Sequence, residues 1–140
     1  MNDYFADTNV FLRYLTDDIP EQAAAVERLL QRAKAGNLGL ITSAMVIAEI
    51  VWTLESYYEL PRSEIRDKVL ATLNTPGLSV EDPDLVAQAI TAYAELNVDF
   101  VDAFNALWMA DHGLDRVVTF DTKHFSRLPN VSAVLPDRAR

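Results

Sequence analysis

The chain has 140 residues, of which 50% are hydrophobic and 24% charged, as expected for one globular domain with its own core. It contains no cysteine, which excludes disulfides, zinc–thiolate sites and iron–sulfur clusters. Its two histidines, His112 and His124, are too few for a three-histidine zinc site. The net charge of −9 argues against nucleic-acid binding, which normally needs a basic surface, unless several carboxylates converge on divalent cations.

The N-terminal residues 1–7 show neither a basic segment nor a long apolar stretch of the kind found in secretory signals. The longest apolar run of helical character, residues 44–54, is interrupted by Glu49 and is too short to span a bilayer. We therefore expect a soluble, cytoplasmic protein without a membrane segment.

Short strands alternate with helices along the chain. The pattern predicts strands at residues 2–6, 38–42, 78–80, 116–120 and 131–135, and leaves the apolar run 10–15 unassigned. It predicts helices at 20–35, 43–57, 61–73, 83–96 and 100–112, and a short turn or helix at 123–125. Pro20 suits a first helical turn, Ser43 a helix cap, and Gly36 and Gly113 helix ends.

Strands separated by helices favour parallel pairing through right-handed crossovers. The predicted fold class is therefore α/β, with residues 1–140 forming one domain in which helices cover both faces of a parallel sheet. In such folds ligands bind at the carboxyl ends of the strands.

Four acids stand out against this pattern. Asp7 and Asp121 each follow a predicted strand, at the edge where ligands bind. Asp102 lies in the first turn of an otherwise apolar helix, and Asn105 shares its side. Glu49 is the only charge in an apolar helix, where an unpaired buried charge is costly. Taken singly, the aspartates are also explained as caps or turn residues, or by the helix dipole.

Four carboxylates in one crevice repel one another, so they need a counter-charge. A hard divalent cation supplies it, and carboxylate oxygens suit Mg²⁺ or Mn²⁺. Because histidine is scarce and cysteine absent, these two metals are favoured over zinc.

Four sequence segments carry a family resemblance. They are Phe5-Ala6-Asp7-Thr8-Asn9-Val10, the run from Ser43 to Glu49, Asp99-Phe100-Val101-Asp102-Ala103, and Val118-Thr119-Phe120-Asp121 followed by His124-Phe125. In order and spacing the chain resembles PIN-domain nucleases over nearly its whole length, and more narrowly the VapC toxins of bacterial toxin–antitoxin pairs. The resemblance implies a three-layer fold with a central parallel sheet of about five strands. It also implies a Mg²⁺-dependent endoribonuclease, a homodimer, and a small VapB-like antitoxin as partner.

The resemblance assigns roles residue by residue. The acids that match the family's catalytic and metal-binding quartet are Asp7, Glu49, Asp102 and Asp121. Asn9 and Thr119 match positions that orient the acids, and Asp99 is either a helix cap or a supporting residue. Asn105 is a further supporting candidate on the helix of Asp102, and Arg13 and Lys123 lie near the acids as candidates for contacting RNA phosphates.

Three other functions are compatible with an α/β fold that carries clustered acids. The main alternative is a catalytically inactive PIN-like module that binds a partner or a metal. A phosphoryl-accepting receiver needs two adjacent acids after its first strand and a lysine after its fifth, whereas Lys123 follows Asp121 by two residues. A phosphatase of the haloacid-dehalogenase type needs a second aspartate where this chain has Asn9.

Overall fold

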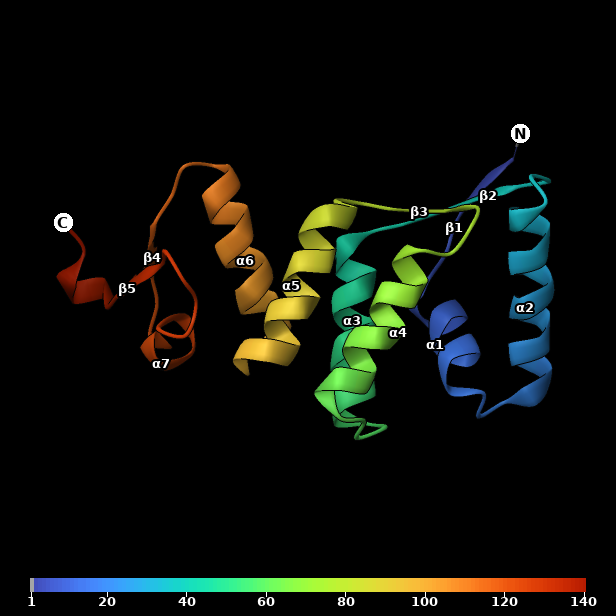
Figure 1. The fold of residues 1–140 in the computed structure, drawn as a ribbon, viewed down its shortest axis with the longest axis horizontal. Coiled ribbons are helices and arrows are strands. Elements are labelled where there is room, and N and C mark those ends of the chain that lie inside the picture. The colour runs from blue at the N-terminus through green and yellow to red at the C-terminus, as the bar shows by residue number, and fades with distance from the viewer. Residues whose placement is uncertain (1) are drawn as a thin grey trace. The chain divides into compact units, whose positions relative to one another are not determined.

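The computed structural model describes residues 2–140, which form two compact units that meet in sequence at Pro83 and Asp84 (Figure 1). Each unit has its own parallel sheet and its own helices. We describe each unit by itself.

The first unit contains a three-stranded parallel sheet in the order β1-β2-β3. Its elements are β1 (Asp3–Phe5), α1 (Thr8–Thr16), α2 (Pro20–Lys34), β2 (Gly39–Thr42), α3 (Ala44–Ser56), α4 (Arg62–Leu73) and β3 (Leu78–Val80). Tyr4 is paired with Leu40, and Leu40 with Leu78. Helices connect both pairs of neighbouring strands, as parallel pairing requires.

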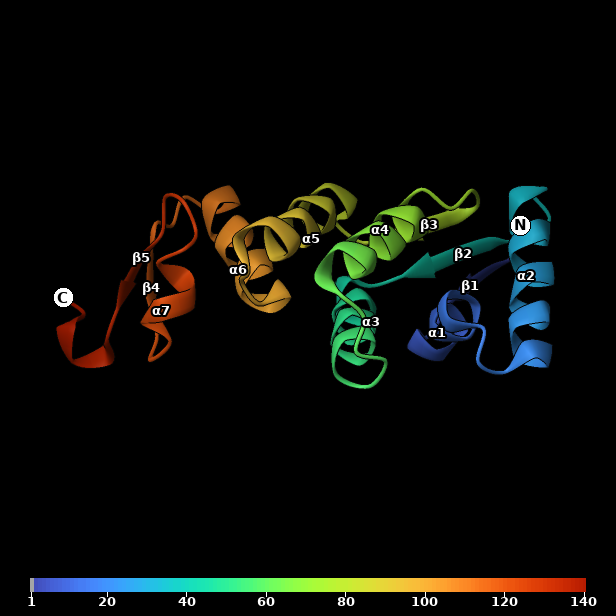
Figure 2. The ribbon, with the colours of Figure 1, turned by 60° about the horizontal axis from the view of Figure 1, so that its bottom comes forward.

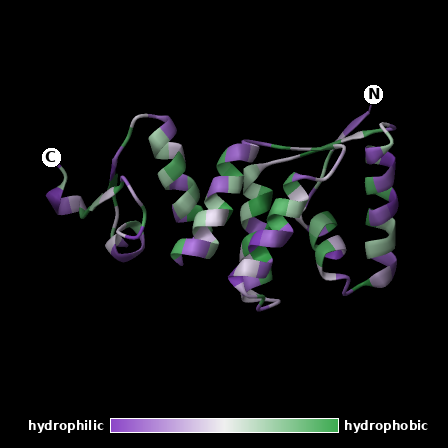
Figure 3. Cartoon of the chain, in the orientation of Figure 1, coloured by the Kyte–Doolittle hydropathy of each residue, from purple (hydrophilic) through white to green (hydrophobic). Residues whose placement is uncertain are grey.

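Helix α3 is built from the most apolar stretch of the first unit (Figure 3). Ile47, Ile50 and Leu54 on this helix are fully buried. Two side chains satisfy free amides at its start: the Ser43 hydroxyl accepts from the Val46 N–H at 3.2 Å, and a Glu81 carboxylate oxygen accepts from the Ala44 N–H at 3.0 Å. The predicted cap at Ser43 is therefore confirmed.

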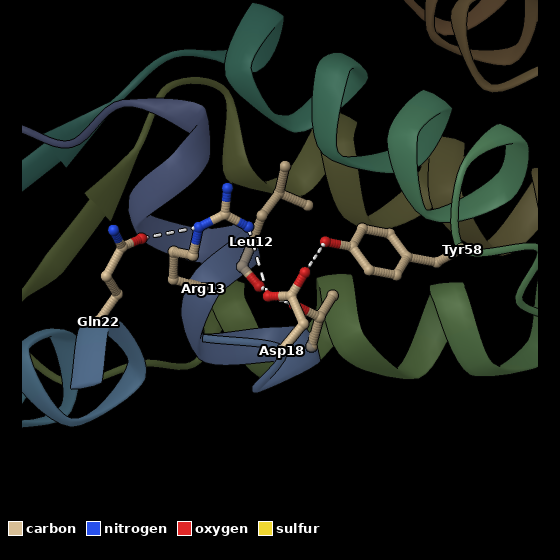
Figure 4. A network of polar contacts seen from close by, with 6 residues as sticks. Leu12, Arg13, Asp18, Gln22 and Tyr58 are labelled. Atoms are coloured by element: carbon tan, nitrogen blue, oxygen red, sulfur yellow. Dashed lines mark hydrogen bonds and ion pairs between the residues drawn. The ribbon is translucent and has the colours of Figure 1, made fainter. Parts of the chain in front are cut away.

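A network of polar contacts joins the corner between α1 and α2 to the end of α3 (Figure 4). The Tyr58 hydroxyl donates to Asp18 at 2.6 Å, and the Thr16 hydroxyl donates to the other Asp18 oxygen at 3.0 Å. The Arg13 guanidinium lies 3.4 Å from Asp18 and donates to Gln22 at 2.9 Å. The hydrogen bond from Tyr58 is the main reason that the pKa of Asp18 lies below its ordinary value, so this carboxylate is held in its charged form.

The second unit holds the helices α5, α6 and α7 and a two-stranded parallel sheet (Figure 2). Its elements are α5 (Pro83–Leu96), α6 (Phe100–Asp111), β4 (Arg116–Val118), α7 (Thr122–Phe125), β5 (Ser132–Val134) and a 3₁₀ turn (Pro136–Arg138). Val117 is paired with Ala133. The α7 helix contacts both α6 and β5, so it links the strands of this unit to the helix that carries Asp102.

The structure corrects two expectations. The predicted single central sheet of about five strands is wrong, because three strands pair in one unit and two in the other. The strands have only three or four residues and therefore form few hydrogen bonds with their neighbours. An apolar run in the sequence can indicate such a strand, but it does not indicate which strand pairs with it. The unassigned run 10–15 belongs to α1, which buries Phe11 and Leu12.

None of the helices formed by residues 2–140 combines the length and the apolar character needed to cross a bilayer.

Two glycines in the first unit give a matched test of its packing. Gly36 and Gly77 have nearly the same left-handed backbone, with φ of +84° and +83°, but only Gly77 faces a close neighbour. A Cβ at position 77 would lie 2.5 Å from the carbonyl oxygen of Ala33, whereas one at position 36 would meet open space. We expect Gly36→Ala to cost about 1–2 kcal/mol, and Gly77→Ala about 3 kcal/mol or more, in urea denaturation. Equal costs would contradict the close approach of Gly77 to Ala33, which lies in α2.

The Asp18 network predicts an acid-dependent contribution to stability. Tyr58→Phe keeps the ring but removes the hydroxyl that donates to Asp18. Because the folded pKa of Asp18 is lowered, the stabilisation is present above the ordinary pKa of 3.8 and is lost as the pH falls through the folded value. We expect the variant to have a lower urea midpoint than the parent at pH 7, and the difference to shrink at pH 3. A difference that is the same at both pH values would rule out this role for the hydroxyl.

Candidate metal and catalytic site

The second unit brings together two acids that lie far apart in its sequence. Asp102 is in the first turn of α6, and Asp121 follows β4 and begins α7. Together with His124 they form a cluster in which one ligand atom from each residue lies within 4.8 Å of the other two. Two carboxylates at this spacing suit a divalent cation.

The surroundings of Asp102 disfavour its negative charge. Partial burial is the main cause, followed by the charges of Asp99 and Asp121, and together they raise the pKa of Asp102 above its ordinary value. Asp99 occupies the N-cap position of α6, but within residues 2–140 its side chain makes no capping hydrogen bond. Its effect on Asp102 is therefore electrostatic.

Asp121 is held in the opposite way. His124 Nδ1 lies 2.8 Å from Asp121 Oδ2, and the His124 backbone N–H donates to Asp121 Oδ1 at 3.3 Å. The hydrogen bond from the ring is the main reason that the pKa of Asp121 is lowered, and the charge of Arg127 adds to it. The Thr119 hydroxyl accepts from the Asp121 backbone N–H at 2.9 Å, so Thr119 orients the backbone that carries this acid. Asp121 is thus held in its charged form, whereas the charged form of the neighbouring Asp102 is disfavoured.

The other two acids of the predicted quartet lie in the first unit. Asp7 is exposed and takes the N-cap position of α1, two residues after the last residue of β1. The next hydroxyl along the chain, Thr8 Oγ1, is buried and has no hydrogen-bond partner among residues 2–140. Buried hydroxyls are normally bonded to protein or water, so this end of β1 contains an unsatisfied polar group beside an acid. Glu49 lies on α3 and is exposed. Its charge is therefore in contact with solvent and does not carry the cost of an unpaired buried charge that its apolar neighbours in the sequence suggest.

The supporting candidates lie in different settings. Asn9 and Asn105 are exposed, on α1 and α6 respectively. The Arg13 guanidinium is bonded to Gln22 and Asp18. Lys123 is exposed on α7, two residues after Asp121.

His124 is the site residue that the sequence analysis did not select. Its spacing was an available signal, because residues three apart face the same side of a helical turn. An aspartate at a helix start followed by a histidine three residues later places the two side chains within reach of each other.

The sequence matches a known family of proteins. The PIN-domain sequence profile matches residues 4–131, and the chain belongs to the PIN-domain family. Within that family it is similar to the VapC ribonuclease of Aquifex aeolicus (strain VF5), with 27% identity over 122 residues. The matched region covers 87% of this chain and 89% of that relative. The resemblance expected from the four sequence segments is therefore confirmed.

The electrostatics of Asp102 predict an effect on stability in the absence of metal. Because its folded pKa is raised, the ionised carboxylate costs stability at neutral pH, and Asp102→Asn removes that cost. In EDTA at pH 7 we expect the variant to melt about 1–3 °C higher, as is reasonable for a charge partly screened by solvent. The gain should shrink as the pH falls toward 4, because the parent side chain then becomes protonated. Melting curves by circular dichroism test this, and a lower melting temperature for the variant at pH 7 would contradict it.

Proposed function

We propose that this protein is a Mg²⁺-dependent endoribonuclease that hydrolyses RNA phosphodiester bonds, with Mn²⁺ able to substitute. The proposal assigns catalysis and metal binding to Asp7, Glu49, Asp102 and Asp121. It treats residues 1–140 as one PIN domain.

The observation that carries the proposal is the close approach of the Asp102 and Asp121 carboxylates, which have oxygens within 4.8 Å of each other, with His124 beside them. Bringing two carboxylates this close is unfavourable without a counter-charge. The pKa of Asp102 is raised mainly by burial and then by the charges of Asp99 and Asp121. Membership of the PIN-domain family and similarity to a VapC ribonuclease support the reaction type.

The chain's own residues have separate tasks in this mechanism. Asp102 and Asp121 present oxygens that would hold a hard cation. The family resemblance assigns Asp7 and Glu49 to the same metal-binding quartet. When bound, the cation supplies Lewis-acid polarisation of the phosphodiester and lowers the pKa of a bound water. Thr119 keeps the backbone at Asp121 in place.

We further propose that the protein acts in the cytoplasm as the toxin of a toxin–antitoxin pair. Its partners would be RNA, a cognate VapB-like antitoxin and a second copy of this chain. Similarity to a VapC ribonuclease supports this assignment. Light scattering of the purified protein tests the homodimer, and a neighbouring reading frame for a small DNA-binding protein tests the antitoxin.

The acids give the direct test of the proposed chemistry. We expect Asp7→Asn and Asp102→Asn each to lower the rate of RNA cleavage by roughly 100-fold or more, because each removes a charge that stabilises the reacting centre. EDTA should abolish cleavage by the parent protein, and added Mg²⁺ or Mn²⁺ should restore it. The assay follows a labelled structured RNA over time with protein purified in parallel.

Asp111→Asn is the matched control, because Asp111 is an exposed acid at the other end of α6 from Asp102. This variant should cleave RNA at the rate of the parent. Unchanged cleavage by both active-site variants would refute the proposal. Tight Mn²⁺ binding by a parent protein that never cleaves RNA would favour the inactive binding module instead.

A further inference from the structure

We infer that His124 is a positioning residue, whose imidazole holds the Asp121 carboxylate in the orientation needed for metal binding. The inference rests on the proposed function, because it concerns the same acidic site. It adds a residue outside the acidic quartet and assigns it a distinct task, which is to fix an acid without touching the metal.

The contacts identify the imidazole as the donor. Asp121 is a carboxylate and offers acceptor sites only, so the proton in the 2.8 Å contact belongs to His124 Nδ1. A nitrogen that carries a proton has no lone pair free for a cation. His124 Nδ1 therefore acts on Asp121 and is not itself a metal ligand.

Both oxygens of Asp121 accept from the same residue. Oδ2 accepts from the ring of His124 at 2.8 Å and Oδ1 accepts from its backbone N–H at 3.3 Å. Rotation of the carboxylate would break both hydrogen bonds together. Each oxygen still has lone-pair capacity, so a carboxylate oriented in this way can bind a cation as well.

Asp121 needs such a restraint. Its side chain is 47% exposed, so it is free of close packing on much of its surface. The neighbouring Asp102 carboxylate repels it, since the charge of Asp121 contributes to the raised pKa of Asp102. Without His124, rotation toward solvent would relieve this repulsion and separate the two acids. Hydrogen-bonding partners of metal-binding carboxylates commonly affect metal affinity by about 10–100-fold.

Three substitutions at position 124 separate the possible roles. The side-chain amide nitrogen of Asn occupies nearly the place of histidine Nδ1, and that of Gln the place of Nε2. His124→Asn therefore keeps the donor to Asp121, His124→Gln moves it, and His124→Ala removes it. Because the Asn and Gln variants carry the same amide group, a difference between them reports geometry rather than general damage to the fold.

The primary measurement is Mn²⁺ binding to the full-length protein, followed by electron paramagnetic resonance of the free ion. We expect His124→Ala and His124→Gln to raise the Mn²⁺ dissociation constant by about 10-fold or more, and His124→Asn to stay close to the parent. In RNA cleavage, the Ala and Gln variants should need correspondingly more Mn²⁺ but approach the parent kcat at saturating metal. Circular dichroism of every variant confirms that the fold is retained.

Several results would overturn the inference. Parent-like Mn²⁺ affinity in His124→Ala would show that the imidazole is not needed. Retained affinity in His124→Gln but not in His124→Asn would make Nε2 a direct ligand. Asp121→Asn separates this inference from the proposed function: if that variant binds Mn²⁺ and cleaves RNA like the parent, the assignment of Asp121 to the metal site fails first. If Asp121→Asn loses binding while His124→Ala does not, only the positioning role is wrong.

Discussion

Repulsion between carboxylates held close together is the constraint on which the site depends. Asp102 is partly buried beside Asp121 and Asp99, and its pKa is raised as a result. Asp121 is kept ionised by His124, and its pKa is lowered. The protein therefore maintains a concentration of negative charge that costs stability in the absence of a cation. Clustered negative charges that destabilise the protein alone, and are stabilised by a bound cation, are typical of a binding site. Fold stability alone does not account for them.

Local signals in the sequence predict most of the helices and strands. The Ser43 cap, the first-turn Pro20 and the stop at Gly113 each depend on the chemistry of one residue and its immediate neighbours, and each helix boundary follows. Strand partners depend on contacts between distant segments, which no local pattern records. For that reason the five strands are predicted individually, whereas their division into sheets of three and two is not. Helix α1 escapes prediction because it has only nine residues and begins at Thr8, soon after β1 ends at Phe5, so its sequence is too short to show a clear helical period.

The same distinction applies to the candidate site. Residue type and position after a strand select Asp7 and Asp121, and isolation among apolar residues selects Asp102 and Glu49. These features are visible because each acid departs from its local pattern. The role of His124 depends instead on the direction of its ring toward Asp121, which follows from the turn that starts α7. Residue type alone suggests that a histidine is a metal ligand or a packing residue. It does not indicate that the histidine orients a neighbouring acid.

The acidic character of the chain limits how RNA can reach such a site. Several basic side chains that would attract phosphate lie close to carboxylates: Arg13 to Asp18, Arg66 to Asp67 and Lys68 to Glu64. Exposed pairs of this kind contribute little to stability, but they lower the positive potential that the cations present to solvent. A polyanion approaching Asp102 and Asp121 meets the negative charges of these two acids and of Asp99. A bound divalent cation would neutralise the charges of Asp102 and Asp121, so in the proposed function metal binding favours substrate approach as well as chemistry. Lys123, which is exposed two residues after Asp121, remains the candidate of the second unit for contacting RNA phosphates in that function.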